Sequence, residues 1–399
     1  MTNAERWNAV MMPNYATPPL TLDRGAGIRV WDTDGTEYLD FVAGIAVSSL
    51  GHAHPAIVEA VSAQVTRLAH TSNLVMHEPG LRLAERLVDI VGAPARVFFA
   101  NSGAEAIECA LKLARKHGRA LDPDGRRLEV VAAHNSFHGR TLGALSITGN
   151  AAKREPFAPL PGPVRFVDFG DVAALRAAVT ERTAAVFVEP GLGEGGVVPL
   201  PSGYLAAARA ACDATGALLV TDEVQSGIGR TGHWLASAAE GVRPDVITLA
   251  KGLGGGLPIA ACIGLGRSGE LFAPGDHGST FGGNPIACAA ALAVLTTIAD
   301  EHLLDSVKRV GEHLADLLAA IDSPLVSGSR GSGVWRALVL TEPTALAVEA
   351  AARTRGLLVN AVKPDVIRLA PPLVVTEQDV DDAVPRLRAA VDAVNEVAR

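Results

Sequence analysis

Lys251 is the residue whose position most strongly suggests chemistry. It follows the apolar run at residues 246–250 and precedes a segment rich in glycine, residues 252–256. Lysines normally lie exposed, so one at the end of a buried strand is unusual. Partial desolvation lowers the pKa of such an amine and makes it a nucleophile or a Schiff-base partner, and the glycines leave room for a bulky group beside it. The alternative is a solvated lysine on a loop.

Asp222 occupies a similar place after the apolar run at residues 217–221. A carboxylate at the end of a buried strand is costly unless it meets a cation. A protonated pyridine nitrogen is one such cation. A structural salt bridge, or a metal ligand in a nucleotide hydrolase, remains an alternative.

Two further segments could bind a phosphate. Residues 101–105 (Asn-Ser-Gly-Ala-Glu) follow the apolar run at 97–100 and open a helix, whose first N–H groups are free to bind an anion. The same segment could be an ordinary capping box of Ser102 and Glu105. Residues 278–285 combine hydroxyls with glycines, which also suits a phosphate, although a plain turn is possible. Together, a phosphate cradle, a carboxylate and a lysine are what pyridoxal phosphate (PLP) requires.

Two other patterns compete with this interpretation. Residues 191–196 fit GxGxxG, which would suggest a nicotinamide-dependent oxidoreductase, but Val-Val-Pro-Leu-Pro follows where that fingerprint must open a helix. His134 and His138 are four residues apart, yet no third ligand is in view. We therefore expect no metal.

The elements that must position these residues indicate an α/β fold. Nearly continuous apolar runs are typical of strands covered on both faces, hence of a mostly parallel sheet. After residue 290 the pattern changes to a helical face at 304–321 and strands at 334–340 and 366–370, which indicates a smaller α+β domain. The N-terminal stretch predicts a loose arm and a hairpin that turns at Asp34-Gly35. The apolar runs lie at residues 97–100, 128–133, 184–188, 217–221, 246–250 and 261–265.

Composition narrows the class of protein. The chain has 399 residues and a net charge of −8, which gives no electrostatic footprint for nucleic acid. Its four cysteines are widely spaced and fit a reducing cytoplasm. The longest apolar run, residues 285–299, is shorter than the ~20 residues of a membrane helix, and the N-terminus does not resemble a signal peptide. We expect a cytoplasmic protein without nucleic-acid or membrane partners.

The set of motifs resembles the class III (ω-) aminotransferases. The resemblance rests on residues 101–103, 137–140, 222–225, Lys251 and 279–285, and on the 251 − 222 = 29 positions between Asp222 and Lys251. It covers nearly the whole chain, from Pro19 to the C-terminal helix. It implies PLP fold type I, with a mostly parallel seven-stranded sheet between helices, and a homodimer with shared active sites. The implied limits are 1–45 (N-terminal arm and part of the small domain), 46–290 (large PLP-binding domain) and 291–399 (small C-terminal domain).

The resemblance also implies cofactor contacts. Lys251 would hold the cofactor covalently and move the proton, while Asp222 would pair with the ring nitrogen. Thr280 would reach the phosphate bound by the partner subunit, and Phe137 would stack on the ring. The implied cofactor-binding set is Ser102, Gly103, Ala104, Phe137, Asp222, Glu223, Val224, Gln225, Lys251 and Thr280.

Substrate contacts are implied in the same way. Arg140, with Ser279 nearby, would bind a substrate carboxylate, Arg368 would bind 2-oxoglutarate, and Glu194 would neutralise Arg368 between these events. Arg140 could instead be a surface residue and Arg368 a packing salt bridge.

Residues 38–47 and 70–74 look like the branch of the family that uses N2-acetyl-L-ornithine in arginine biosynthesis. Ornithine, succinylornithine, succinyl-diaminopimelate and 4-aminobutyrate stay open as donors. A PLP-binding protein with a regulatory role, and the nicotinamide enzyme, are the other classes considered.

Overall fold

A seven-stranded sheet forms the centre of the larger part of the protein in the computed structural model, which describes residues 1–397. Strand β12 runs antiparallel to both its neighbours, and the other pairs are parallel, so the mostly parallel sheet is confirmed. The spatial order is β4 (Ala95–Ala100), β12 (Ala260–Leu265), β11 (Val246–Leu249), β10 (Leu218–Asp222), β7 (Thr183–Val188), β5 (Glu129–Ala133) and β6 (Val164–Val167).

Strand β6 is the one member of this sheet that the apolar runs did not predict. It lies at the edge beside β5, and only Val167 of its four residues is buried, while Arg165 is exposed. An edge strand packs less surface than a central one, so its sequence carries a weaker apolar signal.

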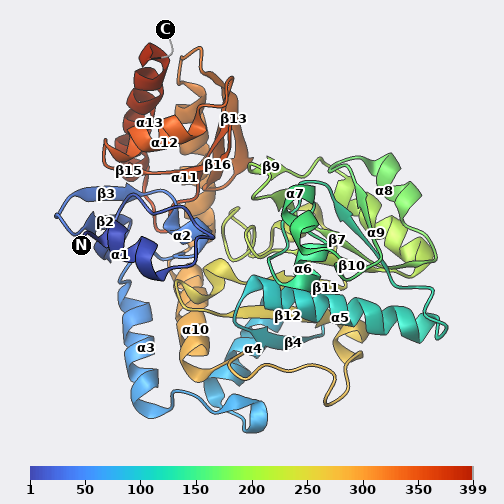
Figure 1. Ribbon diagram of the computed structural model, residues 1–399. Coiled ribbons are helices and arrows are strands. Elements are labelled where there is room, and N and C mark those ends of the chain that lie inside the picture. Colours follow the sequence, from blue (N-terminus) through green and yellow to red (C-terminus); the bar gives the residue numbers. More distant parts are fainter. Residues whose placement is uncertain (398–399) are drawn as a thin grey trace.

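Helices cover both faces of the sheet, as Figure 1 shows. Val130 and Ala132 pack in the same hydrophobic cluster as helix α5 (Gly103–Leu121), whereas Val131 packs with helices α8 (Val172–Ala178) and α9 (Tyr204–Thr215). Side chains alternate across a strand, so both faces of β5 are buried. The remaining helices of this part are α2 (Ala43–Ala46), α3 (Pro55–Arg67), α4 (Glu78–Val91), α6 (Leu142–Ser146) and α7 (Ala151–Arg154), with 3-10 turns η1 (Ser72–Leu74), η2 (Glu155–Phe157), η3 (Ala236–Glu240), η4 (Lys251–Gly254) and η5 (Gly266–Glu270).

The parallel strands end at one edge of the sheet, which brings their following residues together. Asp222 stands opposite Thr248 in the register of β10 and β11. Lys251 comes three residues after Thr248, so the carboxylate and the amine lie at neighbouring strand ends. This is the edge at which open α/β sheets bind ligands.

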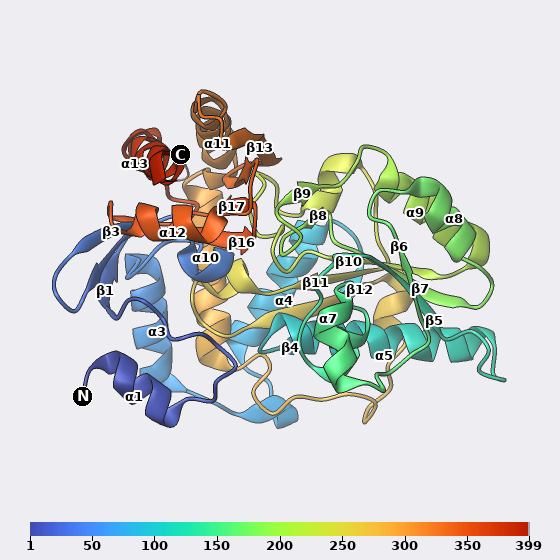
Figure 2. The ribbon, with the colours of Figure 1, turned by 45° about the horizontal axis from the view of Figure 1, so that its top comes forward.

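A smaller α+β unit packs beside this sheet, red to orange in Figure 2. Its four-stranded sheet has the order β13-β14-β17-β16. The final helix contains Pro385, a residue that often interrupts a helix; this helix lacks one internal N–H at the proline and continues. The elements are α11 (Leu303–Ala319), β13 (Val326–Ser332), β14 (Trp335–Leu340), α12 (Ala345–Arg353), β15 (Leu357–Leu358), β16 (Asn360–Lys363), β17 (Val366–Leu369) and α13 (Glu377–Val397).

The N-terminal region joins the smaller unit through a second sheet, in which β3 pairs with β15. The hairpin between β2 and β3 turns at Asp34-Gly35, where Gly35 has a φ of 84° that favours glycine. The elements are α1 (Asn3–Val10), β1 (Leu22–Ala26), β2 (Arg29–Asp32) and β3 (Glu37–Asp40).

Helix α10 (Pro285–Asp300) packs against α3 and α4 and leads into the smaller unit. We propose the domain limits 1–45, 46–290 and 291–399, of which residues 398 and 399 lie outside the described part. Within residues 1–397, no single helix is long and apolar enough to cross a membrane; only α10 and α11 taken together, bent by 70°, pass by length and composition.

Candidate active site

A cavity of about 440 Å³ opens at the carboxyl edge of the large sheet. Residues from five strand ends meet there, although they are far apart in the sequence. Of the residues implicated above in cofactor or substrate binding, those that line it are Ser102, Gly103, Ala104, Phe137, Arg140, Glu194, Asp222, Val224, Gln225 and Lys251.

Lys251 lines this cavity, two residues after the end of β11. Burial, followed by the charge of Arg368, lowers the pKa of its amine to about 8. Its backbone has a φ of 43°, an unusual conformation for a residue with a side chain. Such strain is most often kept where the position of a side chain matters. The amine is therefore largely unprotonated in mildly alkaline solution and can attack an aldehyde.

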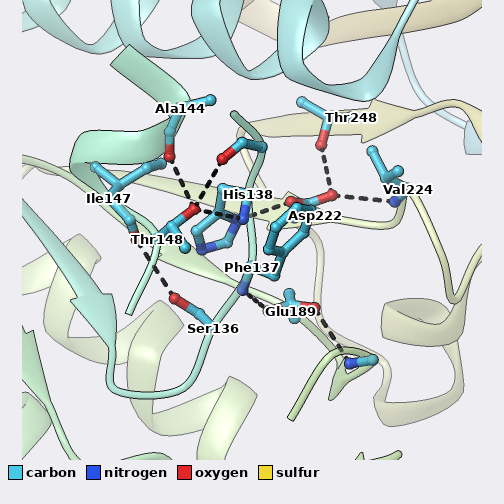
Figure 3. A network of polar contacts seen from close by, with 12 residues as sticks. Ser136, Phe137, His138, Ala144, Ile147, Thr148, Glu189, Asp222, Val224 and Thr248 are labelled. Atoms are coloured by element: carbon cyan, nitrogen blue, oxygen red, sulfur yellow. Dashed lines mark hydrogen bonds and ion pairs between the residues drawn. The ribbon is translucent and has the colours of Figure 1, made fainter. Parts of the chain in front are cut away.

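Asp222 is held by three donors in the network of Figure 3. Its Oδ2 lies 2.7 Å from Nδ1 of the buried His138. Its Oδ1 accepts from the backbone N–H of Val224 at 3.1 Å and from the hydroxyl of Thr248 at 3.2 Å. Burial lowers the pKa of His138, but the hydrogen bond and charge of Asp222 and the charge of Glu189 raise it overall. The raised pKa of His138 favours a protonated imidazole beside the buried carboxylate.

Glu189 is a second buried carboxyl group in the network. It follows β7 and accepts hydrogen bonds from the backbone N–H groups of Phe137 at 2.8 Å and Gly193 at 3.4 Å. Burial raises the pKa of Glu189 to about 7. The carboxyl group thereby ties the Phe137 loop to the end of β7.

The start of α5 has the form of an anion site. The side chain of Ser102 accepts from the N–H of Glu105 at 3.3 Å, as a helix cap does. Glu105 completes no capping box, because its carboxylate turns to the backbone and side chain of Asn101. A Cβ added to Gly103 would lie 2.9 Å from Val224, so only glycine allows this close approach. The backbone N–H groups of residues 103 and 104 remain for an anion.

These features fit PLP. An anion site, a fixed carboxylate and an amine with a lowered pKa line one cavity, and Phe137 and Val224 contribute apolar surfaces to it. The ring, the phosphate and the aldehyde each meet a group of matching chemistry.

Two cationic side chains lie at this cavity or next to a residue that lines it. Arg140 lines it with an exposed side chain, its guanidinium carbon 5.7 Å from the centre of the Phe137 ring. Arg368 is 2% exposed and forms an ion pair of 2.7 Å with Glu194. Burial raises the pKa of Glu194, but Arg368 lowers it overall, so the carboxylate is charged and closes off the guanidinium.

Four of the residues implicated in cofactor or substrate binding lie outside the cavity lining: Arg368, described above, and Glu223, Ser279 and Thr280. The carboxylate of Glu223 accepts from Ser226 and from the backbone of residues 236 and 237, so it holds the loop that follows β10. The hydroxyl of Ser279 accepts from Asn101 at 3.3 Å, next to the cavity, and the neighbouring Thr280 is exposed.

The structure also bears on the two competing sequence patterns, the GxGxxG segment and the pair of histidines. Residues 191–196 comprise β8 (Gly191–Leu192) and most of the turn to β9 (Val198–Pro199). These are two short antiparallel strands, so no helix follows the glycines. Among residues 1–397, no group of three His, Cys, Asp or Glu side chains could hold a metal ion.

Sequence reasoning missed several members of the site. His138 was not predicted to belong to it, although this histidine stands within the same motif as Phe137 and Arg140. Glu189 was overlooked, although it directly follows the apolar run at 184–188, as Asp222 follows its own run. Its place directly after a buried strand is the signal that could have found it. Trp335 and Asn360, from the smaller unit, contact Gln225 and Arg368 respectively and gave no local signal.

Comparisons with known proteins agree with this geometry. The model of the family described as aminotransferase class-III matches residues 10–391. The chain is 56% identical to the acetylornithine aminotransferase of Streptomyces coelicolor, over 99% of this chain and 96% of that protein. It is 54% identical to that of Mycolicibacterium smegmatis, over 99% and 100%.

Solved structures are similar over almost the whole chain. The ornithine aminotransferase from Toxoplasma gondii, whose structure has PLP at the active site, matches with a TM-score of 0.93 and 36% identity, over 98% of this chain and 94% of that one. The N-acetylornithine aminotransferase from Stenotrophomonas maltophilia matches with a TM-score of 0.84 and 38% identity, over 96% and 97%. The chain therefore belongs to the class III aminotransferases, PLP-dependent enzymes of fold type I.

Proposed function

We propose that the enzyme transfers the terminal amino group of N2-acetyl-L-ornithine to 2-oxoglutarate, giving N-acetyl-L-glutamate 5-semialdehyde and L-glutamate. The observation that carries this proposal is the ion pair of Glu194 and the buried Arg368, whose charges both act on Lys251. The amine donor and 2-oxoglutarate present different groups near the amine of Lys251. The site therefore needs a cation, Arg368, that a carboxylate can cover for one substrate and expose for the other. The names of the similar proteins support the choice of amine donor.

The chain's own residues divide the work. PLP, when bound, supplies an electron-withdrawing ring that stabilises negative charge on the substrate carbon. The side chain of Asp222 would face the ring nitrogen, and the N-terminus of α5 would bind the phosphate. Lys251 holds the cofactor and then moves the proton to and from the substrate carbon, for which an amine of pKa about 8 is well suited.

Substrate recognition is assigned to the two arginines. Arg140, at the exposed side of the cavity, binds the α-carboxylate of the acetylated donor, with Ser279 nearby. While that donor is present, Glu194 remains paired with Arg368. When 2-oxoglutarate enters, Glu194 moves away, so that Arg368 binds the α-carboxylate of 2-oxoglutarate.

A homodimer is part of the proposal. Leu74 and Met76 are 89% and 85% exposed, and Phe281, next to Thr280, is 60% exposed. Apolar side chains left in water in this way favour burial against another protein surface. A second copy of the chain would cover them and bring Thr280 to the phosphate of the partner subunit. Size measurement in solution tests this, and a monomer that retains full activity would contradict it.

A cytoplasmic location and a role in arginine biosynthesis complete the proposal. Cys109, Cys212, Cys262 and Cys288 are all buried and free, as suits a reducing compartment.

A panel of amine donors tests the assignment. With 2-oxoglutarate as acceptor, kcat/KM is measured for N2-acetyl-L-ornithine, ornithine, succinylornithine, succinyl-diaminopimelate and 4-aminobutyrate. We expect N2-acetyl-L-ornithine to give the highest value. No amine transfer from it, with good turnover of another donor, would contradict the assignment.

A further inference from the structure

The side-chain amide of Gln225 has its orientation fixed by two donors. Its Oε1 accepts from Nε1 of Trp335 at 3.1 Å and from a terminal nitrogen (Nη1) of Arg368 at 3.0 Å. Tryptophan and arginine side chains can only donate, so the atom between them must be the oxygen. All three residues are buried. The amide nitrogen is thereby directed away from Arg368.

Arg368 has a second neutral acceptor on its other terminal nitrogen. Its Nη2 donates to Oδ1 of Asn360 at 2.6 Å. The two residues are cross-strand partners in the register of β16 and β17, so the backbone itself sets this contact.

The hydrogens of the guanidinium can be counted. Nη1 carries two hydrogens, which serve Glu194 at 2.7 Å and Gln225 at 3.0 Å. Nη2 also carries two, and Asn360 takes one of them. Departure of Glu194 would free one N–H on Nη1, while Nη2 retains its second N–H, so each terminal nitrogen could donate to an incoming carboxylate. This is the fork that a carboxylate binds in bidentate fashion.

We propose that Trp335, Gln225 and Asn360 are positioning residues that hold the Arg368 guanidinium in place while Glu194 is displaced. This rests on the proposed use of a 2-oxo dicarboxylate. Both acceptors are neutral, so they orient Arg368 without cancelling its charge. That charge remains for the incoming carboxylate, and the guanidinium loses little freedom when the carboxylate binds.

Glutarate, a dicarboxylate that cannot accept an amine, is the probe. Its dissociation constant is measured by calorimetry with the PLP-loaded enzyme and with Asn360→Ala, Asn360→Asp and Trp335→Phe. We expect about tenfold weaker binding for Asn360→Ala and Trp335→Phe, since each removes one hydrogen bond of the frame. Asn360→Asp is expected to bind more weakly still, because its carboxylate competes for the guanidinium. Trp234→Phe, outside the cavity, is the matched control.

A kinetic split separates positioning from general damage to the fold. The variants should raise the KM for 2-oxoglutarate while the half-reaction with the amine donor keeps its rate. Wild-type glutarate affinity in both Asn360 variants, or equal loss in both half-reactions, would overturn the inference and leave the proposed function standing. If the unmodified enzyme neither binds glutarate nor uses 2-oxoglutarate, the proposed function fails and the inference falls with it. If Trp335→Phe does not fold, the comparison of the neutral Asn360→Ala with the charged Asn360→Asp still tests the inference.

Discussion

Nδ1 of His138 lies 2.7 Å from Oδ2 of Asp222, and both residues are buried and form part of the wall of the cavity. Within residues 1–397, the other ring nitrogen of His138 has no hydrogen-bond partner. The histidine therefore makes its one side-chain hydrogen bond to the carboxylate proposed to face the cofactor ring. It also adjoins Phe137, so one short loop positions both the stacking ring and the partner of the acid.

Replacing His138 should weaken the hold on the cofactor. His138→Leu leaves the buried Asp222 without one donor, and a hydrogen bond to a charged group contributes roughly 1.5–3 kcal/mol. We predict PLP affinity and kcat about 10- to 100-fold lower, measured by PLP titration of the apoprotein and by steady-state kinetics. His138→Asn keeps an N–H near the position of Nδ1 and should recover most of the loss. Equal defects in the two variants would contradict a role through this hydrogen bond.

Cofactor uptake should depend on pH through Lys251. Burial and Arg368 lower the pKa of its amine from 10.5 to about 8, so the neutral, reactive form dominates above about pH 8. The rate at which the apoprotein captures PLP should rise with pH and level off near pH 9, followed by stopped-flow absorbance. Arg368→Gln removes a charge that lowers the pKa and should move the midpoint to higher pH. A rate that still climbs steeply at about pH 10 would contradict the lowered pKa.

Removing Glu194 should alter which substrate is favoured. Glu194→Ala leaves Arg368 without its covering carboxylate, so glutamate and 2-oxoglutarate bind without displacing it. We predict a lower KM for 2-oxoglutarate and a kcat/KM for N2-acetyl-L-ornithine about tenfold lower, an effect of the size of one charged hydrogen bond. Glu194→Asp retains the charge and serves as the comparison. An unchanged ratio of the two kcat/KM values would show that Glu194 has no gating role.

Gly139 should tolerate no side chain. Its φ is 141°, and an added Cβ would lie 2.8 Å from the Cβ of Ala104 and 2.9 Å from that of Ala144. Gly139→Ala must push the loop from α5, so we predict a loss of about 1–3 kcal/mol in unfolding free energy together with weaker PLP binding. Chemical denaturation measures the first.

Gly35→Ala is the control for backbone strain alone. Gly35 also has a positive φ, but an added Cβ meets nothing within 4 Å. Its PLP affinity should stay at the wild-type value. A Gly139→Ala enzyme as stable as the wild type would contradict the packing argument.

Much of the fold was predictable because buried parallel strands leave a plain sequence signature. The six apolar runs became strands, and the rule that ligands bind at strand ends led to Lys251 and Asp222. Edge strand β6 was missed because it buries little surface. His138 and Glu189 were missed because buried polar residues have no periodicity, and only the partners that the fold brings together explain them.

The contacts between the larger part and the smaller α+β unit could not be predicted from the sequence. Gln225 meets Trp335 across 110 positions and Arg368 across 143. No local pattern encodes such a pairing, since it depends on how the smaller unit packs against the large sheet. The role of Arg368 came from family resemblance, and Asn360 had no signal at all.

The central claim is that Lys251 holds the cofactor. Borohydride reduction of the PLP-loaded enzyme, followed by peptide mass spectrometry, tests it directly, because reduction makes the bond between the lysine nitrogen and the cofactor carbon permanent. We predict a pyridoxyl group on the peptide that contains Lys251, and a Lys251→Ala enzyme that is unlabelled and slower by several powers of ten. A PLP-loaded enzyme whose Lys251 stays unlabelled, or a Lys251→Ala variant with near-normal turnover, would contradict it.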